Sequence, residues 1–146
     1  MLQRFPWRAL CVALCALPLA CNTTSAPVAQ STVAGVYTLQ SIANLPLPAP
    51  ATGAEFAGPL GDSVVVLNGR LVLGDSARAS SEVSYVYANS PGQQHSVQLL
   101  GSYWAVSGDT LRIANDPAGT SNAVFGNLGL GAVQLFIHDV PWVFVR

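Results

Sequence analysis

Short runs of alternating apolar and polar residues, separated by turn residues, fill this chain from Gly35 onward. Apolar residues fall at every second position in six of these runs, and no stretch keeps an apolar period of 3.6 residues. Alternation places apolar side chains on one face of a strand and polar side chains on the other. No run of about 10 to 15 helix-forming residues is available to connect parallel strands. The pattern therefore predicts an all-β domain built on an antiparallel sheet.

Turn residues set the expected strand order. Asn68-Gly69 predicts a two-residue hairpin turn, because both residues tolerate positive φ. Asn89–Gly92 and Ser107–Asp109 predict two further hairpins, and the glycine-rich run Gly126–Gly131 predicts a flexible turn or a bulged strand. Hairpins in series predict an up-and-down meander that closes into a small barrel. We expect strands at residues 36–42, 63–67, 70–73, 82–88, 94–100, 102–106, 110–114, 124–125, 132–138 and 142–145.

The alternation also identifies the side chains that are expected to face the core. They lie at positions i and i+2 of each run, with mostly polar residues between them. They are Tyr37, Leu39, Leu71, Leu73, Val83, Tyr85, Tyr87, Val97, Leu99, Leu111, Ile113, Val133, Leu135 and Ile137.

The first 20 residues differ in composition from the rest of the chain. Fifteen of them are hydrophobic, against about 47% of the remaining 126 residues. Arg4 and Arg8 precede an apolar run at residues 9–20, which is shorter than the roughly 18 to 20 residues that span a bilayer. We therefore predict a signal peptide at residues 1–20. The alternative is a short buried helix of the folded domain.

The segment Leu17–Cys21 resembles the lipobox of bacterial lipoproteins, in which a small residue precedes a cysteine that receives lipid. The resemblance implies cleavage between Ala20 and Cys21. It also implies that Cys21 carries a thioether-linked diacylglycerol and an N-linked acyl chain such as palmitate. After cleavage Cys21 is the one remaining cysteine, so no internal disulfide is expected. The alternative is an ordinary signal, cut near Ala20 or Ala26, that releases a secreted protein.

A tether and a single domain follow the cysteine. Residues 21–32 are rich in Ser, Thr, Ala and Pro, which is typical of a flexible tether, and the domain is predicted at residues 33–146. An aspartate after the lipidated cysteine resembles an inner-membrane retention signal. Because Asn22 stands there, we expect anchoring in the outer membrane of the cell envelope. The chain has no lysine, a formal net charge of −1 and no basic cluster, so we expect no nucleic-acid partner.

Three segments of the domain resemble the lipocalin family and bacterial lipocalin-like domains. Gly35–Leu39 begins the first strand as Gly-x-Trp begins a lipocalin, with Tyr37 in place of the tryptophan. Gly101–Tyr103 and Val106–Leu111 are similar to the strand-turn-strand of the bacterial domains, and Trp142–Arg146 is similar to their last strand. The resemblance implies a barrel that is often lipid-anchored in bacteria. It fixes no ligand.

Residues that could carry chemistry are few. His95 and Ser96 are neighbours in a predicted strand, so their side chains point to opposite faces and cannot act together. His138 precedes an aspartate close to the end of a strand. Asp109 and Asp116 lie in turn sequences, where a short acid bonds to its own backbone. Because metal ligands at recognisable spacing are also missing, we expect no enzyme, no metal and no cofactor.

The aromatic residues are the candidates for ligand binding. Tyr85, Tyr87 and Trp104 could line an apolar pocket inside the barrel. The alternative is that these rings fill the barrel, since about eight strands enclose just enough room for side chains or one small ligand. The leading hypothesis is a lipid-anchored binding module for a small apolar ligand or an envelope partner. The alternative is a structural or stress-protective surface protein with a filled barrel and no ligand.

Overall fold

The computed structural model describes residues 30–53, Phe56 and residues 63–146. Its described part is all-β, apart from the four-residue helix α1 (Gln30–Val33) and a single helical position at Phe56. The predicted signal peptide and Cys21 lie outside the described residues, whereas the last three residues of the predicted tether, Gln30–Thr32, belong to α1. The strands are β1 (Gly35–Ile42), β2 (Leu45–Pro46), β3 (Ala49–Ala51), β4 (Val64–Leu73), β5 (Ala79–Tyr87), β6 (Ser90–Val97), β7 (Tyr103–Ser107), β8 (Thr110–Ala114), β9 (Val124–Gly129), β10 (Ala132–Ile137) and β11 (Val140–Val145).

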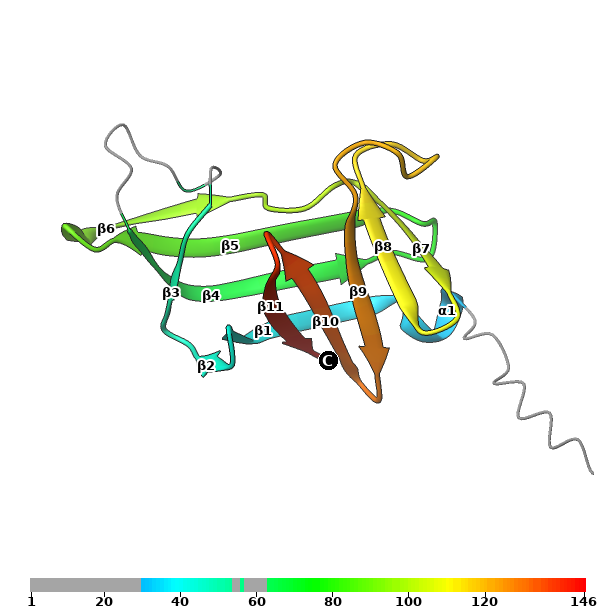
Figure 1. Cartoon of the computed structure of the whole chain (residues 1–146), viewed down its shortest axis with the longest axis horizontal. Coiled ribbons are helices and arrows are strands. Elements are labelled where there is room, and N and C mark those ends of the chain that lie inside the picture. The colour runs from blue at the N-terminus through cyan, green and yellow to red at the C-terminus, as the bar shows by residue number, and fades with distance from the viewer. Residues whose placement is uncertain (1–29, 54–55, 57–62) are drawn as a thin grey trace, which may run out of the picture.

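The strands form one antiparallel sheet, in the order β6-β5-β4-β1-β11-β10-β9-β8-β7 (Figure 1). Two short strands lie off this path: β2 pairs with β1, and β3 pairs with β4. Most neighbours on this path are consecutive strands of the chain. The exceptions are β1 with β4, which are separated in the chain by β2 and β3, and β1 with β11, which are the first and last strands. The predicted antiparallel meander is therefore confirmed.

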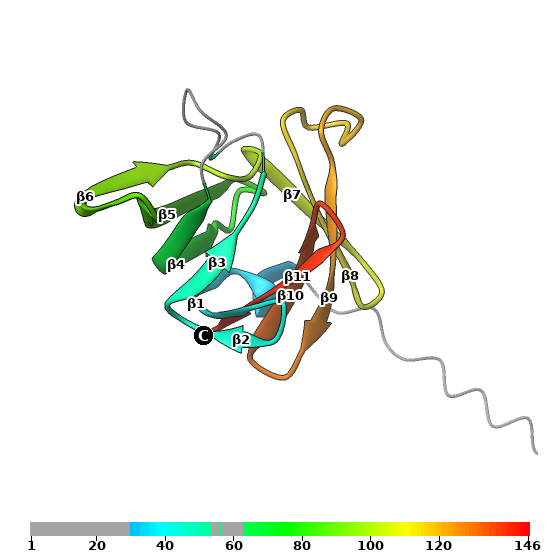
Figure 2. The same cartoon turned by 60° about the vertical axis from the view of Figure 1, so that its left-hand side comes forward.

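The sheet curls into a half-barrel, with β4, β5 and β6 on one wall and β7 to β10 on the other (Figure 2). The pairing of β1 with β11 joins the two walls along a ladder that runs from Thr38 to Ile42 of β1 and has one bulge after Leu39. On the other side, the walls meet at a shorter junction that we call the seam, formed by residues 77–79 and 102–104. Here Arg78 and Tyr103 form an isolated bridge, the Ala79 N–H donates to the Ser102 carbonyl at 2.9 Å, and the Trp104 N–H donates to the Ala77 carbonyl at 3.0 Å.

The concave face of the sheet holds a single hydrophobic core. All fourteen side chains that the alternation predicted to face inward are buried or half-buried. The core cluster also contains large rings whose exposed fractions are at most 3%, namely Phe56, Trp104, Trp142 and Phe144. Side chains from both walls thus pack against one another inside the half-barrel.

The predicted turn at Asn68-Gly69 is wrong, because β4 runs straight through it. β4 pairs with β1 on one side and with β5 on the other, and its register with β5 shifts between Val66 and Asn68. This bulge reverses which positions face inward, so that Val64 and Val66 before it and Leu71 after it are all buried. The Asn68-Gly69 dipeptide, which is typical of a hairpin turn, therefore lies at a bulge inside one strand.

The other predicted turns lie at or next to turns of the structure. The hairpin at Ser107–Asp109 joins β7 to β8, and Gly108 has a φ of +59°. The hairpin expected at Asn89–Gly92 joins β5 to β6, although the turn itself lies at Ala88-Asn89 and β6 starts at Ser90. The glycine-rich run forms most of β9 and then a tight turn at Leu130-Gly131, where Gly131 has a φ of +72°.

Candidate functional site

Two of the three predicted ligand-binding aromatics lie together on the inner face of β5. The rings of Tyr85 and Tyr87 are 5.6 Å apart, and both contact His95 of β6, at 5.6 Å and 4.9 Å respectively. Phe56 packs edge-on against Tyr85 at 5.2 Å. The rings in this cluster therefore occupy the space that a ligand between them would need.

Burial raises the pKa of the Tyr85 phenol, and its interaction with Tyr87 raises it further. The phenol is therefore protonated at neutral pH. It can take part in hydrogen bonds but supplies no anion.

Trp104 lies elsewhere, at the seam. Its side chain is buried, and its indole Nε1–H donates to the Gly74 carbonyl at 2.9 Å. Tyr85 is six residues beyond Ala79 in β5, which corresponds to about 20 Å along the strand. The structure therefore separates Trp104 from the two tyrosines and gives it a place in the junction between the walls.

The residues considered for catalysis are also separated. His95 faces the tyrosines, whereas the neighbouring Ser96 is exposed. His138 and Asp139 form the turn between β10 and β11, with φ values of +50° and +62°. Among the described residues, no three His, Cys, Asp or Glu side chains gather closely enough to hold a metal ion.

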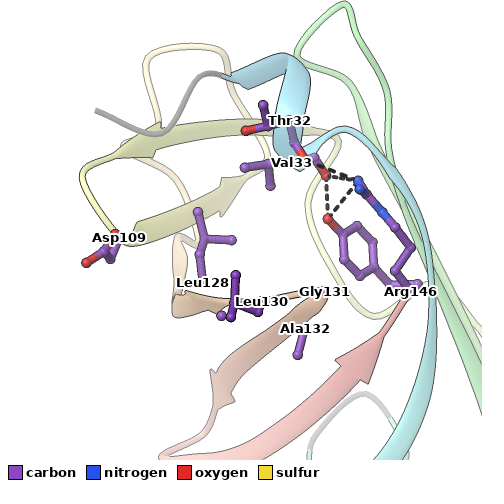
Figure 3. A pocket seen from close by; sticks show the side chains of 10 residues that line it. Thr32, Val33, Asp109, Leu128, Leu130, Gly131, Ala132 and Arg146 are labelled. Atoms are coloured by element: carbon purple, nitrogen blue, oxygen red, sulfur yellow. Dashed lines mark hydrogen bonds between the residues drawn. The ribbon is translucent and has the colours of Figure 1, made fainter. Parts of the chain in front are cut away.

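A cavity of about 420 Å³ lies at the end of the half-barrel where α1 precedes β1 (Figure 3). We call it the pole cavity. Six parts of the chain contribute to it: α1, β1, the β7–β8 turn, β9 with the following turn, β10 and the end of the chain after β11. Its lining residues are Thr32, Val33, Tyr37, Asp109, Leu128, Gly129, Leu130, Gly131, Ala132 and Arg146.

Arg146 makes one wall of the pole cavity rigid. Its guanidinium donates to the carbonyl oxygens of Thr32 (3.3 Å), Val33 (3.1 Å) and Ala34 (2.5 Å). It also bonds to the Tyr37 Oη at 3.2 Å and lies 5.1 Å from the centre of that ring. The Tyr37 hydroxyl in turn donates to the Val33 carbonyl at 2.5 Å. These bonds satisfy the carbonyls of Thr32 and Val33 at the end of α1 and fasten the start of the first strand to Arg146.

The opposite wall is apolar and is held by backbone hydrogen bonds. The Leu128 N–H donates to the Asp109 carbonyl, and the Arg146 N–H donates to the Gly131 carbonyl, both at 2.8 Å. Leu128 is half-buried against the core, whereas the side chain of Leu130 is fully exposed at 107% of its reference area. In Figure 3 both leucines lie on one side of the cavity, across from Thr32 and Val33. Such a lining suits an apolar chain or ring.

The pole cavity could not be predicted from the sequence, because its lining comes from residues 32, 33, 37, 109, 128–132 and 146, which lie far apart in the chain. The glycine-rich run at residues 126–131, which predicted a turn or a bulged strand, is one sequence feature that marks part of the lining.

A second depression, of about 320 Å³, lies on the outer face of β4 and β5. Arg70 and Glu82 are register partners there, and Ser80 and Gln98 complete a polar lining. It suits an apolar ligand less well than the pole cavity does.

Comparison of the chain with protein-family models, with curated proteins and with solved structures gives no match. Within the part of the chain that the structure describes, no helix is both long and apolar enough to cross a membrane.

Proposed function

We propose that this protein is a lipid-anchored lipoprotein of the bacterial cell envelope and that it binds a small apolar ligand in the pole cavity. The observation that carries the ligand proposal is the contrast between the interior of the half-barrel and its end. The inner face is filled by its own side chains, whereas the pole cavity is open and lined by Val33, Leu128 and Leu130.

The sequence supports the anchor. A basic start, an apolar run and a lipobox-like segment, in which the small residue Ala20 precedes Cys21, support lipidation at this cysteine. Three acyl chains would make attachment effectively permanent, because each buried CH₂ contributes about 0.8 kcal/mol. Asn22 favours the outer membrane.

The second candidate is a structural or stress-protective surface protein without a ligand. The filling of the inner face by Phe56, Trp142 and Phe144 favours it. The two candidates share the anchor and differ in whether the pole cavity takes up a molecule.

A Cys21→Ala variant tests both parts of the proposal. We expect this variant to lose the mass of the lipid and to leave the membrane fraction, which yields a full domain in aqueous solution. In that background, the dye anilinonaphthalene sulfonate should bind saturably and be displaced by decanoate. Leu128→Gln should weaken binding about tenfold by placing an amide in the apolar lining. Leu45→Gln, a matched change at a half-exposed leucine of β2 outside the cavity, should leave it unchanged.

The anchor and the ligand are tested separately. Membrane partitioning and a mature mass that survive Cys21→Ala would refute the anchor. Absence of saturable binding, or equal binding by the two glutamine variants, would refute the ligand and leave the structural candidate.

A further inference from the structure

We propose that the end of the domain around the pole cavity docks on the bilayer, with the Leu130 side chain inserted among the lipid acyl chains. This inference rests on the proposed anchor at Cys21. It adds a second, non-covalent contact with the membrane and an orientation of the domain.

Leu130 is placed as an inserting side chain would be. It is fully exposed at the tip of the β9–β10 turn, whereas the other large exposed hydrophobic residues of the described chain are 37% to 52% exposed. Gly131 takes up the left-handed φ of the turn, so Leu130 is free of that strain. Transfer of an exposed leucine side chain from water into an apolar phase is favourable, because it lowers the free energy.

The tip is rigid rather than loose. The Gly131 carbonyl is bonded to the Arg146 N–H, and Leu128 is bonded to the backbone of the neighbouring β7–β8 turn at Asp109. The two turns are thus fixed beside α1. Insertion of a pre-ordered tip costs little conformational entropy.

The tether brings this end, and not the other, to the membrane. Nine residues lead from Cys21 to Gln30 at the start of α1, and they reach at most about 30 Å extended or about 15–18 Å as a flexible coil. α1 and Leu130 line the same cavity region, since Thr32 and Val33 face Leu128 and Leu130 across it. The loop at residues 115–123 lies at the opposite end of β9 from the turn that carries Leu130.

The charge of this end permits the contact. Asp109 and Arg146 are the charged residues that line the pole cavity, and their charges are opposite. Arg146 is bonded to the carbonyls of α1, so its charge is already partnered by protein dipoles. One leucine would be too weak to hold a free protein, but the anchor keeps the domain at high effective concentration. Insertion of Leu130 is therefore expected to set the orientation of the domain and its depth in the bilayer, whereas the lipid anchor provides the attachment.

The test places a fluorophore at each end of the lipidated protein. Leu130→Cys and the control Ala118→Cys, an exposed position in the 115–123 loop, are labelled with an environment-sensitive nitrobenzoxadiazole dye. Each protein is reconstituted in vesicles of phosphatidylethanolamine and phosphatidylglycerol. The dye at position 130 should shift its emission to shorter wavelength, lose fluorescence to nitroxide-labelled acyl chains and resist aqueous iodide. The dye at position 118 should remain accessible to iodide.

A second measurement needs no label. Vesicles should slow hydrogen exchange at the amides of residues 129–132 in the lipidated protein, and Leu130→Asp should abolish that slowing while the protein stays anchored.

The outcomes distinguish this inference from the proposed function. A protein that lacks lipid and does not float with the vesicles overturns both. An anchored protein whose dye at position 130 stays open to iodide overturns the docking alone. Shielding from iodide without quenching by the lipid nitroxide also overturns it, because a segment of protein would then cover the tip.

Discussion

Individual side chains hold the irregular parts of this molecule in place. Asp116 is the clearest case, since its carboxylate accepts the Thr120 N–H at 3.1 Å and the Ser121 N–H at 2.6 Å. The sequence predicted this role, because a short acid before a proline in a turn bonds to nearby backbone. This carboxylate and two backbone hydrogen bonds, from the Asn115 N–H to the Ser121 carbonyl and from the Gly119 N–H to the Asp116 carbonyl, hold the connection between β8 and β9.

The bonds of Asp116 predict a pH-dependent loop. The Ser121 N–H, with help from Thr120, lowers the pKa of Asp116 to about 2. An unfolded aspartate has a pKa of about 3.9, so the bonds stabilise the loop fully above that value and are lost as the pH falls through about 2. Asp116→Ala should therefore reduce the NMR protection factors of the Thr120 and Ser121 amides at pH 7. At pH values below 2 the variant and the parent protein should converge.

The control for this prediction is Asp75→Ala, at an exposed aspartate between β4 and β5. It should leave the Thr120 and Ser121 amides unchanged at every pH. Equal protection in the parent protein and Asp116→Ala at pH 7 would show that the loop does not depend on the carboxylate.

At the scale of strands, alternation correctly predicted fourteen residues that face the core. It missed other core residues, such as Val64 and Trp142, and it did not predict where β4 ends. Asn68-Gly69 is a strong local turn signal, yet by continuing β4 keeps one long ladder with β5. Its other edge pairs with β3 before this dipeptide and with β1 after it. Gly69 is buried there, and a Cβ at this position would lie 3.0 Å from Leu39. Gly69 therefore allows close packing against Leu39 in the assembled sheet and does not form a turn. A local sequence pattern contains no information on that packing.

Two glycines of β9 give a matched test of strand packing. A Cβ on Gly126 would lie 2.3 Å from the Gln134 carbonyl oxygen of β10 and 2.7 Å from the Leu135 side chain. A Cβ on Gly129 would meet its nearest neighbour, the Ala132 carbonyl oxygen, at 3.8 Å. Gly126→Ala should therefore lower the free energy of unfolding by about 1–3 kcal/mol in urea denaturation, since overpacking forces the strands apart. Gly129→Ala should change it by less than about 0.5 kcal/mol. If the two variants lose the same free energy of unfolding, the close approach of β10 to Gly126 carries no packing cost, and the prediction is wrong.

The molecule as a whole depends on contacts that no sequence pattern contains. The i, i+2 spacing of Tyr85 and Tyr87 correctly placed both rings on one face, but it could not show that Phe56 and His95 fill the space around them. The pole cavity is assembled from segments more than 100 residues apart, such as α1 and Arg146. Such a site follows only from the closure of the sheet.

That closure rests on two junctions of different length. The β1–β11 ladder is continuous but for one bulge after Leu39, whereas the seam has one bridge, between Arg78 and Tyr103. Side chains reinforce the seam: the Arg78 guanidinium lies 4.2 Å from the centre of the Tyr103 ring, and the Ser81 hydroxyl accepts the Leu100 N–H at 2.8 Å. The seam is therefore the junction at which the walls should separate first.

Trp104→Phe tests this order of separation. The substitution keeps an aromatic ring in the core but removes the Nε1–H that donates to the Gly74 carbonyl, and it leaves that carbonyl without the bond at a cost of about 1–3 kcal/mol. Hydrogen exchange should accelerate at the Ala79 and Trp104 amides well before it does along β1 and β11. Trp142→Phe is the matched control, because Trp142 pairs with Ile42 in the long ladder. It should lower global stability without selective opening of the seam. If both variants accelerate exchange uniformly over the sheet, the half-barrel opens as one cooperative unit and the seam is no weaker than the ladder.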